Sequence, residues 1–215
     1  MPDLRLAVRT LIRTPFVTGV AIASLALGIG ANTAIFSLIQ RLLLRSLPVS
    51  EPAQLVNIHA QGPNPGSQSC SNAGSCAVLF SYPMFRDLEQ SQTALAGIAA
   101  HRTIGADLSF RNKTVSGDGM LVSGSYFSVL GLRPTLGRLL SSDDDRTIGG
   151  HPVVVLSHHY WANELGSDPT VLDQTILVNG ETTTIIGVGP KGFEGTTLGS
   201  RPRIFAPLTM SRVLT

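Results

Sequence analysis

The stretch that decides the fold lies at residues 14–40 and reads TPFVTGVAIASLALGIGANTAIFSLIQ. It lies between Arg13 and Arg41 and contains 27 residues without a charged side chain. As an α-helix it would be about 40 Å long, whereas the hydrocarbon core of a bilayer is about 30 Å thick. The sequence therefore predicts a membrane-spanning helix that continues beyond the bilayer and tethers the residues that follow it.

The residues before the span have a different character. Residues 1–15 predict an amphipathic helix for the membrane surface, because three arginines spaced four apart share one helical face: Arg5, Arg9 and Arg13. Pro15 breaks or turns the chain where the span begins. We interpret residues 16–47 as the transmembrane helix with its extension, and residues 48–215 as the outer domain.

The arginines on the two sides of the span predict its orientation. Three of them and the amino terminus precede the span, and two follow it, Arg41 and Arg45. The positive-inside rule then favours a cytoplasmic N-terminus and a main domain on the outer side of the membrane, in a chain with a single span.

A cleaved signal peptide is the alternative interpretation of the same stretch. The apolar core of a signal peptide is usually about 7–15 residues long and ends at a small-residue cleavage site. Here the apolar run continues through residues 34–39, after the small residues. Its length therefore favours a membrane anchor.

Small residues recur within the span and predict contacts with other helices. We place Ala26, Gly30 and Ala34 on one face and Gly19 and Ala23 on another. Small residues at this spacing let a neighbouring membrane helix approach closely. The alternative is that Ala and Gly are simply common in membrane helices.

Charge is divided unevenly along the chain. Residues 1–47 carry five Arg and one Asp, whereas the other 168 residues carry 11 basic and 13 acidic side chains. The basic excess thus flanks the span, and the outer domain has no basic excess of the kind that binds nucleic acid. Only 14% of residues are charged, and Gly plus Pro make up 35 of 215, which indicates a turn-rich extracytoplasmic domain.

The two cysteines, Cys70 and Cys76, lie in the segment QGPNPGSQSCSNAGSC. Its Gly, Ser, Asn and Pro residues predict an exposed loop. In an oxidising compartment the pair is a candidate disulfide, and two free thiols are the alternative. No second Cys or His pair stands at the spacing of metal ligands.

The outer domain combines strand and helix patterns. The clearest signal is TILVNGETTTIIGVG at residues 175–189, where two β-branched runs flank Asn179-Gly180, a favoured hairpin turn. The other patterns predict strands at 55–60, 106–111, 113–123, 151–157 and 203–208, and helices at 81–100, 125–131 and 158–166. Because hairpins imply antiparallel pairing, we predict an α+β domain of two subdomains, the second over residues 133–200.

No constellation of side chains predicts catalysis, a cofactor or a metal. His158 and His159 are adjacent, so they do not face one ligand, and we assign them to a surface or interface. The acidic run at 143–145 lacks the spacing of an EF-hand and is better explained as a solvated turn. Asp118 is explained by a turn or edge position as well as by catalysis.

Several motifs resemble one known family. DLRLAVRTLIRTPFVTGVAIASLALGIGANTAIFSLIQRLLLRSLP resembles the first membrane segment of MacB-like ABC transporter permeases of the large acidobacterial type, and LALGIGANTAIFS is its most specific part. Four later motifs resemble the family's periplasmic core domain: SYPMFRDL, VSGSYFSVLGLRPTLGR, PVVVLSHHYW and GSDPTVLDQTILVNGETTTIIGVGPKGFEG. The resemblance is weakest around the cysteines.

The resemblance implies a non-enzymatic part of a transport machine in the bacterial inner membrane, with the main domain periplasmic or extracellular. Such permeases pair with a cytoplasmic ABC ATPase, and ATP-driven closure of the membrane helices moves the periplasmic domains in efflux or mechanotransmission. Other permease helices or a second permease copy, and a periplasmic protein, are the other implied partners. Family members usually have three or more further membrane helices, so we expect this chain to be a truncated fragment. A single-span binding module without ATP coupling remains the alternative.

Overall fold

The computed structural model describes residues 15–43, 48–58, 80–197 and 199–215. The chain divides into two compact units, Met1–Ser46 and Leu47–Thr215. The expected amphipathic helix at residues 1–15 lies outside the described residues, except for Pro15.

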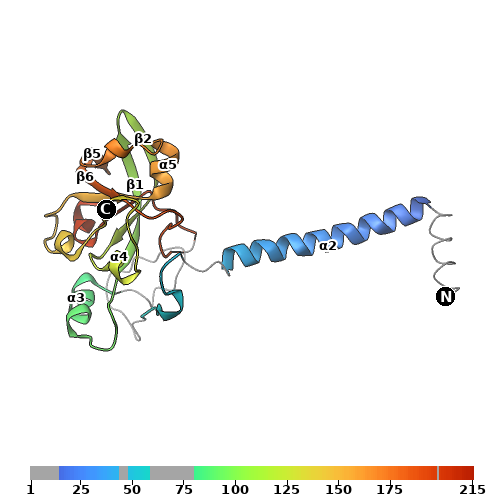
Figure 1. Ribbon diagram of the computed structural model, residues 1–215, viewed down its shortest axis with the longest axis horizontal. Helices are drawn as coiled ribbons and strands as arrows, with labels where there is room; N and C mark the ends of the chain where they lie inside the picture. Colours follow the sequence, from blue (N-terminus) through green and yellow to red (C-terminus); the bar gives the residue numbers. More distant parts are fainter. Residues whose placement is uncertain (1–14, 44–47, 59–79, 198) are drawn as a thin grey trace. The chain divides into compact units, whose positions relative to one another are not determined.

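The described residues of the first unit form one continuous helix, α2 (Pro15–Leu43) (Figure 1). Its part Pro15–Ser37 is long and apolar enough to cross a membrane, with a mean hydropathy of 1.7. Large apolar side chains project from it without cover, among them Phe16, 82% exposed, and Leu27, 77% exposed. The predicted apolar helix is therefore present, and its surface is suited to lipid rather than to water.

The second unit is built on one seven-stranded sheet, in the order β3-β6-β4-β7-β2-β1-β5. The strands are β1 (His101–Phe110), β2 (Lys113–Val122), β3 (Leu136–Gly137), β4 (Val153–Leu156), β5 (Thr175–Val178), β6 (Glu181–Val188) and β7 (Ile204–Pro207). Because β6 pairs with β5 as well as with β4, six strands close into a ring and β3 extends it beside β6.

Pairing within the ring is mixed. Strand β2 runs parallel to β7, and β4 runs parallel to β6, whereas the other pairs are antiparallel. Together with the helices this confirms the predicted α+β class, although the two parallel pairs were not foreseen. Strands on both sides of residue 133 belong to the same sheet, and a separate subdomain over 133–200 stays a prediction.

Two tight turns determine the hairpins. Arg111 and Asn112 join β1 to β2, and Asn179 and Gly180 join β5 to β6, all four with positive φ. Two consecutive residues with positive φ match the twist of a two-residue hairpin. The Asn179 amide also accepts a hydrogen bond from the Asp107 N–H at 2.8 Å, and so reinforces the short seam where β5 meets β1.

Short helices cover the sheet and connect its strands. They are η1 (Pro52–Gln54), α3 (Tyr82–Ser91), α4 (Tyr126–Val129), η3 (Ser142–Asp145), α5 (His158–Glu164), η4 (Pro169–Val171), η5 (Leu208–Met210) and α6 (Ser211–Leu214). Serine hydroxyls cap two of them, since Ser81 accepts from the Met84 N–H and Ser157 from the Tyr160 N–H.

The core has two parts because strand residues alternate between the two faces of the sheet. One cluster takes side chains from all six ring strands and fills the ring, for example Leu108, Leu121 and Ile185. The second lies on the opposite face, where β2, β4 and β7 contribute Met120, Val122, Val155 and Phe205, and α4 contributes Tyr126 and Phe127. Phe205, for instance, points away from the ring that Ile204 and Ala206 fill.

Two predicted elements were wrong. Residues 55–58 form no strand, and positions 59–60 lie outside the described residues. The helix expected to reach residue 100 ends at Ser91, where Gln92 turns to an extended backbone and its side chain accepts from the Leu95 N–H. Strand β1 then begins at His101, five residues earlier than predicted.

Candidate functional site

The five small residues assigned to helix packing all lie on α2 and are exposed: Gly19, Ala23, Ala26, Gly30 and Ala34. At about 100° per residue, they lie within roughly 80° of one another around the axis of a continuous helix. They therefore form one face, and the division into two faces was wrong. A Cβ added at Gly19 or Gly30 would meet nothing within 4 Å. This surface permits close approach of another helix, and packing there stays a prediction.

The candidate disulfide cannot be placed. Cys70 and Cys76 lie outside the described residues, and their pairing stays a prediction.

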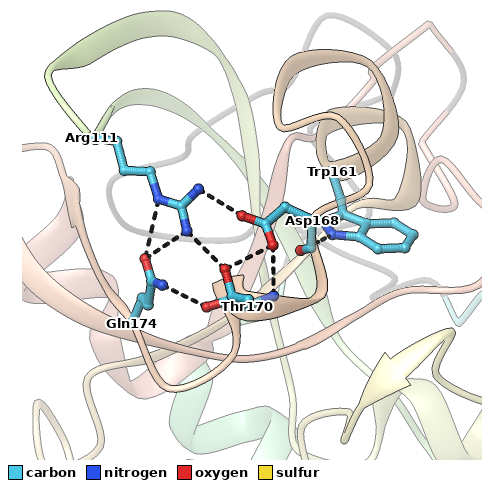
Figure 2. Close-up of polar contacts among 5 residues, drawn as sticks. All are labelled: Arg111, Trp161, Asp168, Thr170 and Gln174. Atoms are coloured by element: carbon cyan, nitrogen blue, oxygen red, sulfur yellow. Dashed lines mark hydrogen bonds and ion pairs between the residues drawn. The ribbon is translucent and has the colours of Figure 1, made fainter.

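A polar cluster joins the β1–β2 hairpin to the segment that follows α5 (Figure 2). The Arg111 guanidinium donates to Asp168 Oδ2 at 2.7 Å, to Thr170 Oγ1 at 3.1 Å and to Gln174 Oε1 at 3.2 Å. Trp161 closes the cluster from α5, because its indole N–H donates to the Asp168 carbonyl at 2.8 Å. One arginine thus joins the β1–β2 hairpin to residues 168–174, and Trp161 joins that segment to α5.

The cluster holds Asp168 ionised. The hydrogen bond from Arg111, and then those from the Thr170 hydroxyl and N–H, lower the pKa of Asp168 to about 2. Arg111 also lies 4.9 Å from the Phe110 ring centroid, a cation–π distance. Four hydrogen bonds from the guanidinium go to side chains of the same domain, so the cluster is suited to holding the fold.

A second arrangement surrounds the end of α4, where residues 48–55, at the start of the outer domain, contact the rest of that domain. The Ser50 hydroxyl donates to the Gly131 carbonyl at 3.0 Å, while Val49 and Leu55 pack against the second core cluster, which includes Tyr126 and Phe127. Gly131 has φ 64° and ends α4, where its N–H donates to the Ser128 carbonyl. We call residues 126–132 the α4 corner.

Four aromatic rings connect the α4 corner to the sheet. Phe127 lies edge-on to Phe205 of β7, with 5.3 Å between the ring centroids, and Phe193 stacks on Phe205 at 5.9 Å. Tyr126 lies 5.3 Å from Phe127, and burial raises its pKa to about 12. Edge-on and offset rings at these distances pack favourably, so the corner and β7 form one rigid cluster.

The acidic run at 143–145 is not a solvated turn, which corrects the prediction. Asp144 is 5% exposed and Asp145 is 1% exposed, whereas Asp143 is exposed and pairs with Arg146. Asp144 accepts from Arg138 at 2.6 and 2.8 Å. Burial works to raise the pKa of Asp144, but the hydrogen bonds from Arg138 and Ser141 outweigh it and lower that pKa.

Asp145 plays a different part from its neighbour. Its carboxylate accepts from the N–H groups of Thr209 and Gly124, at 3.0 and 3.3 Å. Burial raises the pKa of Asp145 and outweighs these hydrogen bonds. The Tyr82 hydroxyl donates to the Asp145 carbonyl, so this residue joins α3, the segment before α4 and η5.

The other candidate residues are structural in this arrangement. His158 lies edge-on to Trp161 and His159 contacts the Asn163 amide, so the two imidazoles have separate neighbours. Asp118 lies within β2 and accepts from the Ser200 hydroxyl at 2.9 Å. Within the part of the chain that the structure describes, no group of three or more His, Cys, Asp or Glu side chains is placed to hold a metal.

Sequence reasoning missed the residues that organise both arrangements. Arg111 and Asp168 are 57 positions apart, and Ser50 and Gly131 are 81 apart, so no local pattern relates them. Two signals existed: Gly131 was expected to end a helix, and a turn was expected near Asn112. Neither reveals which distant side chain it meets.

Comparisons with known proteins bear on both units. A family model described as the MacB-like periplasmic core domain matches residues 18–215. The match thus begins within α2 and continues through the whole outer domain. No curated protein sequence matches the chain.

Two solved structures are similar to this chain. The periplasmic region of MacB from Actinobacillus actinomycetemcomitans is 22% identical, with 58% of this chain and 53% of that chain covered and a TM-score of 0.48. The extracellular domain of the noncanonic ABC-type transporter YknZ from Gram-positive bacteria is 16% identical, with 62% and 65% covered and a TM-score of 0.51.

The chain therefore spans about half to two thirds of these solved chains, and the likeness to the YknZ domain concerns the fold alone. Family membership rests on the model match, which covers nearly the whole sequence. The chain belongs to the MacB-like periplasmic core domain family of ABC-type transporter permeases.

Proposed function

We propose that this chain is the permease component of an ABC-type transporter and transmits ATPase-driven motion through α2 to its outer domain. The role is mechanical and non-enzymatic, in efflux or in mechanotransmission. The observation that carries the proposal is the single family match that runs from α2 through the outer domain.

The physical properties of the two units support this role. Helix α2 has 29 residues, about 43 Å at 1.5 Å per residue, which exceeds the roughly 30 Å hydrocarbon core. The outer domain has a ring of strands with a tightly filled interior, where Leu108, Leu121 and Ile185 are 0% exposed. A stiff helix and a closed domain are suited to passing on displacement with little internal deformation.

The proposal includes topology and partners. The arginine bias supports a cytoplasmic N-terminus in the bacterial inner membrane and a periplasmic or extracellular main domain. A cytoplasmic ABC ATPase supplies the motion, and the small-residue face of α2 receives other permease helices or a second copy. A periplasmic protein is the proposed recipient at the outer domain.

The test is to express the complete coding locus and purify the permease in detergent through an affinity tag. We expect an ABC ATPase to co-purify and its Mg-ATP turnover to depend on the permease. A matched preparation in which residues 15–43 are replaced by an unrelated membrane helix controls for general membrane effects. Turnover and recovery of the ATPase that are the same with and without this permease would contradict the proposal.

The same experiment addresses the alternative of a single-span binding module. Stable membrane insertion together with no ATPase recovery, under conditions in which the outer domain remains folded, would favour that alternative. Downstream coding sequence with three further apolar spans would instead favour the permease.

A further inference from the structure

We propose that residues 48–55 and the α4 corner form a rigid joint, held by the contact between Ser50 and Gly131. Through this joint, displacement of residues 48–55 is transmitted to the sheet. The joint itself is a property of the folded domain. Its use in transmitting motion rests on the proposed function.

The joint is held by contacts of different kinds. The Ser50 hydroxyl donates to the Gly131 carbonyl at 3.0 Å, and the two half-buried side chains of Val49 and Leu55 pack against the second core cluster. Within the segment, the N–H of Gln54 donates to the Glu51 carbonyl at 3.1 Å. Pro48 and Pro52 restrict the backbone further, because proline fixes φ.

Gly131 is the residue on which this close approach depends. A Cβ added at Gly131 would lie 2.5 Å from Ser50 Oγ and 2.9 Å from Ser50 Cβ, distances that side chains do not tolerate. Glycine at this position therefore ends α4 with a positive φ and also leaves room for Ser50 in residues 48–55.

A continuous path leads from the joint into the sheet. Leu132, which follows Gly131, donates its N–H to the Phe127 carbonyl at 3.0 Å. The Phe127 ring then contacts Phe205 of β7. Since β7 lies between β4 and β2, displacement at Ser50 reaches the middle of the sheet through packed side chains.

The chain offers a matched pair of glycines for the test. Gly131 and Gly166 both follow a short helix and both have φ 64°, so an added Cβ imposes similar backbone strain at each. A Cβ at Gly166, however, meets nothing within 4 Å. Comparing Gly131→Ala with Gly166→Ala therefore isolates the clash with Ser50.

The experiment is hydrogen exchange, followed by mass spectrometry, on the full chain in detergent, without an ATPase. We expect Gly131→Ala to accelerate exchange of residues 48–58 about tenfold over wild type, and Gly166→Ala to leave that segment unchanged. Adding Ser50→Gly to Gly131→Ala removes the atoms that clash. The double variant is expected to exchange no faster than Ser50→Gly alone.

Equal exchange of residues 48–58 in the two alanine variants would overturn the joint. Faster exchange in the double variant than in either single variant would overturn it as well, because the clash would not be the cause. Failure of ATPase coupling beside the expected exchange pattern would contradict the proposed function and leave the joint standing.

Discussion

Large apolar side chains are exposed on helix α2 and mostly buried in the outer domain. On α2, Phe16 is 82% exposed and Leu27 is 77% exposed, whereas in the domain Phe205 and Leu108 are 0% exposed. Both units are nevertheless parts of one family match. The domain is stabilised by its own burial of apolar surface, and α2 requires a second apolar medium.

The comparison predicts that similar substitutions have different consequences in the two units. A substitution in the core should alter the free energy of unfolding of the domain. A substitution on α2 should alter membrane insertion and leave the domain unchanged.

The largest expected effect is at the centre of the aromatic cluster. Phe205→Ala removes a ring that contacts Phe127 and Phe193, and should lower the free energy of unfolding by about 3–5 kcal/mol. Phe36→Ala on α2 is the matched control, because Phe36 is 64% exposed. Urea unfolding in detergent checks both variants, and equal losses would contradict the separation of the two units.

The next effect concerns insertion. Leu27→Arg places a charge near the middle of the candidate span and should disfavour membrane insertion by about 3 kcal/mol. Leu27→Ile keeps the apolar surface and is the control. The measurement is the fraction of chain that stays in the membrane after alkaline extraction. Full retention of the arginine variant would mean that α2 is not the anchor.

A smaller loss is expected at the buried acidic run. Asp144→Asn weakens the paired hydrogen bonds from Arg138 and should lower domain stability by about 1.5–3 kcal/mol. Asp143→Asn, on the exposed neighbour, should stay within about 0.5 kcal/mol of wild type. Similar urea midpoints for the two variants would show that burial of Asp144 does not matter.

The smallest effect is pH-dependent and concerns the Arg111 cluster. The pKa of Asp168 is lowered to about 2 from its ordinary value of 3.8, so its ionised form favours the folded state. That contribution is present above about pH 4 and is lost as pH falls through 2. Asp168→Asn should therefore be less stable than wild type at pH 7, with a difference that shrinks toward pH 2.

Urea unfolding of wild type and Asp168→Asn at several pH values between 2 and 7 measures this difference. A gap that stays constant over that range would show that ionisation of Asp168 does not contribute. Arg111→Lys provides a second check, because a lysine cannot reproduce the forked contacts to Asp168, Thr170 and Gln174.

Local patterns explain which parts of the fold could be predicted. The apolar run of α2 and the Asn179-Gly180 hairpin each arise from neighbouring residues, and both are present. The parallel pairs β2–β7 and β4–β6 join strands distant in sequence, and nothing in either strand records its partner. For the same reason, the sequence does not predict that six strands close into a ring.

The candidate site was harder to predict than the fold. The acidic run looked solvated because its charges are adjacent. Asp145 is nevertheless buried, and its carboxylate accepts a hydrogen bond from the N–H of Thr209, 64 positions away. The pattern at 55–60 predicts a strand, but residues 55–58 form none, and the Leu55 side chain packs against the second core cluster. In both cases a distant partner outweighed the local pattern.

The most direct test of the central claim is hydrogen exchange of the outer domain in the assembled permease–ATPase complex, compared in Mg-ATP and Mg-ADP. Transmission through the membrane predicts a nucleotide-dependent change in exchange at residues 48–58 and at the α4 corner. Identical exchange in the two nucleotides, while the ATPase hydrolyses ATP, would contradict it.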